Sequence, residues 1–305
     1  MKTNSPMELL SLDEYTRSFF NSEREGLEKN YPGISEERIR REVRQLLSQT
    51  QLNPSDTSKA IFFPSATDEV TLFFEELKTG RPIEQIRKRA FFYRSEFYVN
   101  ESVLIPRSET EILVEEVATY INKTLSKSVS ICDIGTGSGA IILSLLQESQ
   151  FEINGLATDI SKEALEVAKR NLFLQRFKFN KNSHLDFHQG DRLAGVDTKF
   201  DIIVSNPPYI KSIQDYPTVH HQVSTFEPHL ALFIEDEKYD EWFEELFKQV
   251  ENCLHERGLF YMEGHEDHLE ELAKKLENAG FCNVEIIKDY TNRNRFIKGY
   301  KNAKA

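Results

Sequence analysis

The chain has 305 residues, enough for about two domains, and its composition is that of a folded protein. Hydrophobic residues make up 39% of the sequence and include 22 phenylalanines and 11 tyrosines, which excludes an intrinsically disordered chain. The net charge of −12 at pH 7 argues against stable binding to nucleic acid, because such binding requires a basic surface. The three cysteines form no CxxC pair, and no apolar run reaches signal-peptide or membrane-span length, so we expect a reduced, cytoplasmic protein without membrane segments.

Residues 1–90 are nearly neutral and are predicted to form a small helical domain. A capping-box pattern predicts a helix near residues 11–29. Ser35 can begin a second helix with apolar residues at helical spacing, and a third helix is expected to end at Gly80. Residues 52–65 contain two prolines and are interpreted as a connecting loop.

Residues 91–105 differ in character from the segments on either side. Aromatic and β-branched residues flank Asn100-Glu101, which predicts two strands that turn at this dipeptide. We interpret the segment as a linker hairpin between the helical domain and a second domain, residues 106–305.

Strand-like and helix-like segments alternate from residue 106 to the end of the chain. Strands are expected at 129–134, 155–159, 184–188, 200–205, 258–263, 283–289 and 294–300, and helices at 109–123, 138–148, 161–175, 240–256 and 266–279. Such alternation is typical of a mostly parallel sheet covered by helices on both faces, so we assign the α/β class.

A glycine-rich segment follows the first of these strands and opens a helix. Gly135-x-Gly137-x-x-Ala140 fits a relaxed dinucleotide-binding pattern, whereas Asp133-x-Gly135-x-Gly137-x-Gly139 fits the loop that binds S-adenosylmethionine. Glycines let the backbone approach a ligand, and a helix N-terminus favours its polar groups. A tight turn without a ligand is the third alternative, and the loop alone does not decide among the three.

Two further polar positions follow the next two strands. Asp159 can accept hydrogen bonds from both ribose hydroxyls of a nucleoside, or it can simply cap the helix that begins at Ser161. Asp191 or its neighbouring backbone can meet an adenine edge, or it can form a polar loop with Arg192. These positions support a nucleoside ligand without separating the two cofactors.

The segment Asn206-Pro207-Pro208-Tyr209 ends the strand predicted at 200–205 and decides between them. The two prolines fix φ and remove two backbone donors, which leaves carbonyl acceptors. The asparagine oxygen adds another acceptor, and the tyrosine ring offers a flat wall. Together they suit a planar –NH2 group, for which a dehydrogenase has no use. A rigid turn at the end of the strand is the alternative.

Asn-Pro-Pro-Tyr behind such a glycine-rich loop resembles the amino-group methyltransferases, which act on adenine, cytosine or glutamine side-chain nitrogens. Further segments resemble the HemK/PrmC-type glutamine methyltransferases that modify peptide chain release factors. These segments are Leu104–Val114 (LIPRSETEILV), Thr79–Ile83 (TGRPI), Phe226–Pro228 (FEP) and the C-terminal strand pair with Lys288-Asp-Tyr290, Arg293 and Arg295. The resemblance covers about residues 72–300 and departs from the family at Ser108, where a second proline is usual.

The resemblance implies a Rossmann-like class I methyltransferase domain with a mostly parallel seven-stranded sheet, and a helical N-terminal domain that recognises the substrate. It implies S-adenosylmethionine as cofactor and the glutamine of a release factor's Gly-Gly-Gln motif as methyl acceptor. The implied cofactor contacts are Asp133, Gly135, Thr136, Gly137, Ser138, Gly139, Asp159, Asp191, Arg192 and Asn206, and the implied catalytic residues are Asn206, Pro207, Pro208 and Tyr209.

Three other functions remain alternatives: methylation of a glutamine in another protein such as a ribosomal protein, methylation of an exocyclic amine in nucleic acid, and a non-catalytic regulator that binds the methyl donor. No histidine, cysteine or lysine lies in the motif, so we assign no general base and expect positioning and electrostatics to dominate. His265-Glu-Asp-His268 is not an HExxH motif and no third ligand is evident, so no metal site is expected.

Overall fold

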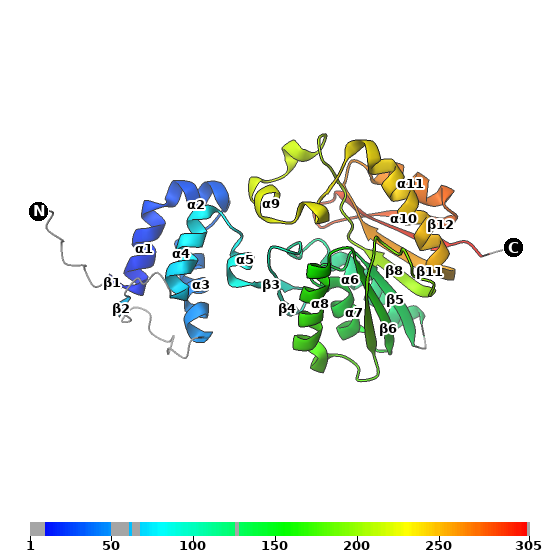
Figure 1. The fold of residues 1–305 in the computed structure, drawn as a ribbon, viewed down its shortest axis with the longest axis horizontal. Coiled ribbons are helices and arrows are strands. Elements are labelled where there is room, and N and C mark those ends of the chain that lie inside the picture. Colours follow the sequence, from blue (N-terminus) through cyan, green and yellow to red (C-terminus); the bar gives the residue numbers. More distant parts are fainter. Residues whose placement is uncertain (1–9, 50–60, 63–67, 126–127, 304–305) are drawn as a thin grey trace, which may run out of the picture. The chain divides into compact units, whose positions relative to one another are not determined.

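The computed structural model describes residues 10–49, 61–62, 68–125 and 128–303 (Figure 1). The chain divides into two compact units, residues 1–87 and 88–305, so the division falls just before the boundary expected near residue 90. Within the described residues, no helix combines the length and the apolar character that a bilayer span requires.

The first unit is helical. It consists of α1 (Leu12–Ser22), α2 (Arg24–Asn30), α3 (Glu36–Gln49), α4 (Glu69–Thr79) and α5 (Ile83–Arg87), with a short antiparallel pair of β1 (Leu10–Ser11) and β2 (Ile61–Phe62). Its core contains the fully buried side chains of Leu27, Ile39, Phe73, Phe74 and Leu77. Gly80 ends α4 in the left-handed conformation, at a φ of 83°.

Two expectations for this unit need correction. The helix expected at 11–29 has the predicted capping box, but it is two helices that meet at Glu23. The hydroxyl of Ser22 donates to the carbonyl oxygen of Phe19 (3.0 Å), and such a local bond competes with continuation of a helix. The loop expected at 52–65 contains strand β2, and its other residues lie outside the described part of the chain.

The hairpin expected in 91–105 turns at a different place. Its strands are β3 (Arg89–Phe92) and β4 (Ser95–Tyr98), so the turn is at Tyr93-Arg94 and not at Asn100-Glu101. The carboxylate of Glu111 accepts the backbone N–H of Tyr93 (2.8 Å), whereas the side chain of Asn100 accepts the backbone N–H of Ser102 (3.0 Å) in a local turn. The hairpin belongs to the second unit and is not a linker.

A seven-stranded sheet forms the centre of the second unit. The strands are β5 (Val129–Ile134), β6 (Ile153–Asp159), β7 (His184–Gln189), β8 (Phe200–Ser205), β11 (Leu254–Glu263), β12 (Phe281–Lys288) and β13 (Asn294–Lys301). Their order is β12-β13-β11-β8-β5-β6-β7, and β13 runs opposite to the common direction of the other six strands. The prediction of a mostly parallel seven-stranded sheet is confirmed.

Helices cover both faces of this sheet (Figure 1). One face carries α6 (Glu111–Thr124), α7 (Ala140–Glu148) and α8 (Lys162–Gln175), and the other carries α10 (Tyr239–Cys253) and α11 (Leu269–Asn278). Side chains alternate between the two faces: Ile131 packs in the cluster with α6 and α7, and the neighbouring Cys132 packs in the cluster with α10 and α11.

The order of the strands predicts a ligand site at the carboxyl ends of the central strands. After β5 the chain adds β6 and β7 on one side and β8 on the other, so the direction of strand addition reverses between β5 and β8. Open α/β sheets bind ligands at the carboxyl ends of the strands at such a point. The segment between β8 and α10 was not anticipated as structured, but it contains the parallel pair β9 (Ile210–Lys211) and β10 (Phe233–Ile234) and the helix α9 (His221–Phe226).

Candidate active site

The glycine-rich loop joins β5 to α7 and has a conformation that requires its glycines. Gly135, Gly137 and Gly139 have φ values of 67°, 54° and 80°, a region that side chains with a Cβ rarely adopt. A Cβ on Gly139 would also lie 3.1 Å from Cδ1 of Leu143, so the turn into the helix has little room for a side chain. The loop is fastened to β6 by the backbone N–H of Thr136, which donates to the carbonyl oxygen of Thr158 (2.9 Å).

Asp133 holds this loop through a buried hydrogen bond. Its side chain is fully buried, and Oδ2 accepts a hydrogen bond from Oγ1 of Thr136 (2.7 Å). Burial raises the pKa of Asp133 to about 7, because the charged form loses its hydration. Asp133 is not among the residues that line the cavity described in the following paragraphs. Its role in the structure is to hold the loop through its hydrogen bond with Thr136.

Asp159 connects the loop to the end of β6. Its Oδ2 accepts the backbone N–H of Gly137 (2.9 Å), and its Oδ1 accepts the backbone N–H of Ser161 (2.9 Å). The N-cap of α8 is Ser161, whose side chain accepts the backbone N–H of Ala164. Asp159 is therefore not the cap of this helix, and burial raises the pKa of its carboxyl group.

Asp191 and Arg192 form a corner that a tryptophan completes. Nη2 of Arg192 lies 2.7 Å from Oδ2 of Asp191, and the guanidinium carbon lies 4.9 Å from the centroid of the Trp242 ring. Arg192 has a φ of 56°, which turns the chain at this corner. Sequence analysis did not identify Trp242, because α10 follows the motifs at a large distance along the chain.

These elements surround one cavity of about 490 Å³ within the second unit. Ten of the thirteen predicted site residues line it: Gly135, Thr136, Gly137, Ser138, Asp159, Asp191, Arg192, Asn206, Pro207 and Pro208. The other three, Asp133, Gly139 and Tyr209, are not among the residues that line it. The volume is that of a small-molecule site.

Asn206 lines the cavity and carries a buried acceptor without a partner. Its Nδ2 donates to Oγ1 of Thr110 (3.2 Å), while its Oδ1 is buried and has no hydrogen-bond partner among the residues that the structure describes. An unpaired buried amide oxygen costs free energy, about 1–3 kcal/mol. A ligand that donates an N–H to this oxygen would remove that cost.

A buried carboxylate determines which way the amide of Asn206 points. Oγ1 of Thr110 donates to Oε2 of Glu263 (2.6 Å), and the hydroxyl of Tyr209 donates to Oε1 of Glu263 (3.1 Å). The single proton of the Thr110 hydroxyl is used on Glu263, so Thr110 can only accept from Asn206. The –NH2 of Asn206 therefore faces Thr110, and the oxygen is left as the buried acceptor without a partner.

Burial raises the pKa of Glu263, because the fully buried carboxylate has lost its hydration. The hydrogen bonds from Thr110 and Tyr209 and the nearby charge of Arg295 oppose this shift. Burial and the charge of Glu263 raise the pKa of the Tyr209 hydroxyl, which keeps it a donor. No motif pointed to Glu263 at the sequence level, since its partners are 54 and 153 residues away along the chain.

A second buried carboxylate holds the segment that contributes Leu104, Pro106, Arg107 and Thr110 to the cavity wall. Glu227 accepts the backbone N–H of Ile105 (2.9 Å) and lies 2.6 Å from Nη2 of Arg107. Only 1% of the Glu227 side chain is exposed, so this pairing replaces its hydration. Both partners lie in segments on which the family resemblance rested, but neither was assigned a role.

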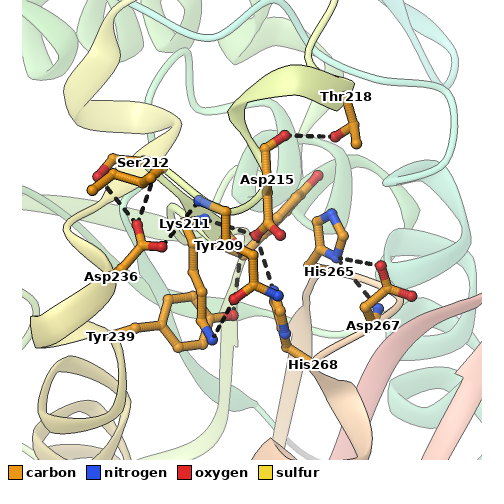
Figure 2. A network of polar contacts seen from close by, with 12 residues as sticks. Tyr209, Lys211, Ser212, Asp215, Thr218, Asp236, Tyr239, His265, Asp267 and His268 are labelled. Atoms are coloured by element: carbon orange, nitrogen blue, oxygen red, sulfur yellow. Dashed lines mark hydrogen bonds and ion pairs between the residues drawn. The ribbon is translucent and has the colours of Figure 1, made fainter.

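The sequence-based expectation about His265 and His268 is wrong in one respect. No third ligand was evident, but the fold brings Asp215 against both histidines, and its Oδ2 lies 2.9 Å from Nε2 of His268 (Figure 2). Asp215 follows Tyr209 by a few residues, in the segment after β9. The histidines lie between β11 and α11, so the cluster depends on tertiary structure.

Comparison with known proteins agrees with this geometry. Residues 125–297, more than half of the chain, match the family model of a methyltransferase domain. A solved 16S rRNA N2 G1207 methyltransferase of Thermus thermophilus, in complex with AdoMet and guanosine, has a TM-score of 0.51 at 15% identity. That match covers 70% of this chain and 49% of the other, and it supports the fold alone.

Curated relatives are closer. A release factor glutamine methyltransferase of Flavobacterium psychrophilum is 36% identical over 226 residues, which covers 73% of this chain and 76% of the relative. The enzyme of the same name from Leptospira interrogans is 37% identical over 224 residues, with the same coverage. The chain carries the methyltransferase fold, and at this identity over most of both sequences it belongs to the release factor glutamine methyltransferase family.

Proposed function

We propose that this enzyme transfers a methyl group from S-adenosylmethionine to the side-chain amide nitrogen of the glutamine in the Gly-Gly-Gln motif of peptide chain release factors. The observation that carries the proposal is the buried, unpaired Oδ1 of Asn206 in the cavity wall, in a chain of this family. A glutamine amide supplies the planar –NH2 donor that this oxygen lacks.

The cavity fits the proposed methyl donor. Gly135 to Ser138 place backbone in its wall, and Asp159 can accept hydrogen bonds from ribose hydroxyls there. The corner of Asp191 and Arg192 lies beside the flat Trp242 ring, which suits an adenine. S-adenosylmethionine supplies an activated methyl group on a positively charged sulfur.

The chain's own residues bind and orient the acceptor nitrogen. An amide nitrogen is a poor nucleophile, because its lone pair is delocalised into the carbonyl group. Oδ1 of Asn206 and a backbone carbonyl of the proline pair accept its two N–H bonds and hold the nitrogen in line with the methyl group. These acceptors place negative potential on the amide hydrogens, which stabilises the positive charge that develops on nitrogen. The nitrogen then loses one proton to solvent water, so the product is a neutral N-methyl amide.

The helical unit would contribute binding energy away from the reaction. We assign residues 1–87 to contact with other surfaces of the release factor, which would raise the specificity for a folded protein substrate. In this proposal the enzyme acts in the cytoplasm and forms no stable complex with nucleic acid.

Methyl transfer to a purified release factor tests the proposal. The purified enzyme is incubated with the release factor and labelled S-adenosylmethionine, and the product is mapped by mass spectrometry. We expect one added methyl group on the glutamine of Gly-Gly-Gln. The matched control is the same release factor with Gly-Gly-Ala. Equal labelling of both proteins, or preferred labelling of a ribosomal protein or of DNA, would contradict the assignment.

A further inference from the structure

Asp215, His265 and His268 form a compact cluster outside the cavity. The three side chains are 6%, 16% and 9% exposed, so water does not solvate them freely. Each offers one ligand atom, and these atoms all lie within 4.8 Å of one another. Figure 2 shows both imidazole rings beside the Asp215 carboxylate.

We propose that Asp215, His265 and His268 bind a divalent transition-metal ion, with Zn²⁺ as the best-suited species. Two imidazoles and one carboxylate are a common ligand set for zinc, whereas Mg²⁺ and Ca²⁺ prefer oxygen ligands throughout. This inference does not depend on the identity of the methyl acceptor.

The distances are close to those that an ion needs. Three atoms within 4.8 Å of one another share a point no farther than about 2.8 Å from each, and zinc ligands lie roughly 2.0–2.2 Å from the metal. Each ligand atom therefore has to move inward by about 0.8 Å at most, which small side-chain rotations supply. A tight turn already brings the two histidines together, because the backbone N–H of His268 donates to the carbonyl oxygen of His265 (3.0 Å).

Neighbouring groups orient the proposed ligands. The backbone N–H of Lys211 donates to Oδ2 of Asp215 (2.9 Å), which fixes the carboxylate. The backbone N–H of Asp267 donates to Nδ1 of His265 (3.3 Å), and Oδ2 of Asp267 lies 3.9 Å from the same nitrogen. Ligation through Nε2 of His265 therefore requires the ring proton to move to Nδ1, with Oδ2 of Asp267 as its acceptor. A carboxylate beside the non-ligating nitrogen is typical of histidine ligands. Binding of the metal would displace the proton that His268 shares with Asp215.

The cluster lies where a bound ion would link two separate segments of the chain. Asp215 belongs to the segment that follows Asn206–Tyr209, and His268 immediately precedes α11. The Tyr209 ring centroid lies 6.5 Å from that of His265, and the hydroxyl of Tyr239 donates to the carbonyl oxygen of Tyr209 (3.3 Å) (Figure 2). A bound ion would therefore join the segment after the motif to α11, next to the last residue of the motif.

Zinc binding to the full-length protein tests the proposal. Metal-free protein is titrated with Zn²⁺ in competition with a chromophoric chelator, and thermal unfolding is followed with and without Zn²⁺. We expect one bound zinc per chain and a higher Tm with the metal, because the ion binds the folded state. Asp215→Asn, His265→Phe and His268→Gln should each weaken binding by at least about tenfold and abolish the shift in Tm.

The chain offers a matched control. His184 forms an exposed pair with Asp186 (2.9 Å) but is outside the cluster, so His184→Ala should leave zinc binding unchanged. Asp215→Asn keeps the size of the side chain, and Co²⁺ absorption provides a second measure of ligation if another variant folds poorly. Absence of a bound zinc in the wild-type protein, or equal binding by the cluster variants and the His184 variant, would overturn the proposal.

Discussion

Removal of the Thr110 hydroxyl should separate cofactor binding from methyl transfer. Thr110→Val keeps the shape of the side chain but leaves Nδ2 of Asn206 without the acceptor at 3.2 Å and Oε2 of Glu263 without the donor at 2.6 Å. The Asn206 amide then loses the described hydrogen bond that fixes its orientation, so the turned amide is no longer disfavoured. The turned amide presents a donor to the glutamine, where the reaction needs an acceptor.

The size of the effect follows from the cost of a buried unpaired donor. That cost is about 1–3 kcal/mol, which lowers the fraction of Asn206 in the productive orientation by about 5- to 150-fold. We therefore expect the single-turnover rate of methyl transfer to fall by about this factor. The affinity for S-adenosylmethionine should change little, because Thr110 bonds to Asn206 and Glu263 and not to the loop at Gly135–Gly139.

Rapid-quench methylation of the release factor measures the rate, and calorimetric titration measures the cofactor affinity. Thr110→Ser retains the hydroxyl and should keep most of the activity, which separates the hydrogen bond from the packing of the methyl group. Glu263→Gln provides a second probe, because a glutamine –NH2 can donate to Thr110 and free the Thr110 proton for Asn206. A Thr110→Val enzyme with the wild-type single-turnover rate and an intact fold would refute the role of this network.

Four further changes test other parts of the proposal. Asp159→Ala should weaken S-adenosylmethionine by about tenfold to hundredfold in calorimetry, since charge-assisted hydrogen bonds contribute about 1.5–3 kcal/mol; unchanged affinity would contradict the ribose contact. Asn206→Ala should abolish single-turnover transfer while cofactor affinity stays near wild type, and a normal rate would disprove the amide-acceptor mechanism. Removal of residues 1–87 should reduce methylation of the intact release factor far more than cofactor binding, and an equal loss of both would argue against substrate recognition by this unit. The pKa of Asp133 is raised to about 7, so its carboxyl group binds a proton more tightly in the folded state. The free energy of unfolding of the wild-type protein should therefore fall by up to about 1.4 kcal/mol per pH unit as pH rises from about 4 to 7. Asp133→Asn should flatten this part of the profile of Tm against pH, and an unchanged slope would exclude Asp133 as its source.

Local patterns in the sequence were sufficient for most of the sheet. Strands expected at 129–134 and 200–205 have the same bounds in the structure, because each is rich in apolar and β-branched residues and is followed by a distinctive polar or glycine-rich motif. The hairpin turn was misplaced, because it depends on a contact between Tyr93 and Glu111 that the local pattern does not contain. The pair β9 and β10 was not expected for another reason: each of these strands has only two residues, which is too short for a recognisable pattern.

The two halves of the candidate site differ in how far the sequence could predict them. The cofactor loop is encoded locally, because Gly135, Gly137 and Gly139 take conformations that other residues resist. The orientation of Asn206 is encoded at a distance, through a hydroxyl 96 residues earlier in the chain and a carboxylate that lies at the end of β11. A motif can therefore identify which residue accepts the substrate amide, but only the fold determines which atom of that residue faces it. Substitutions at Thr110 and Glu263 accordingly test the mechanism more sharply than substitutions within the motif, because they leave every proposed substrate contact in the chain and change only its direction.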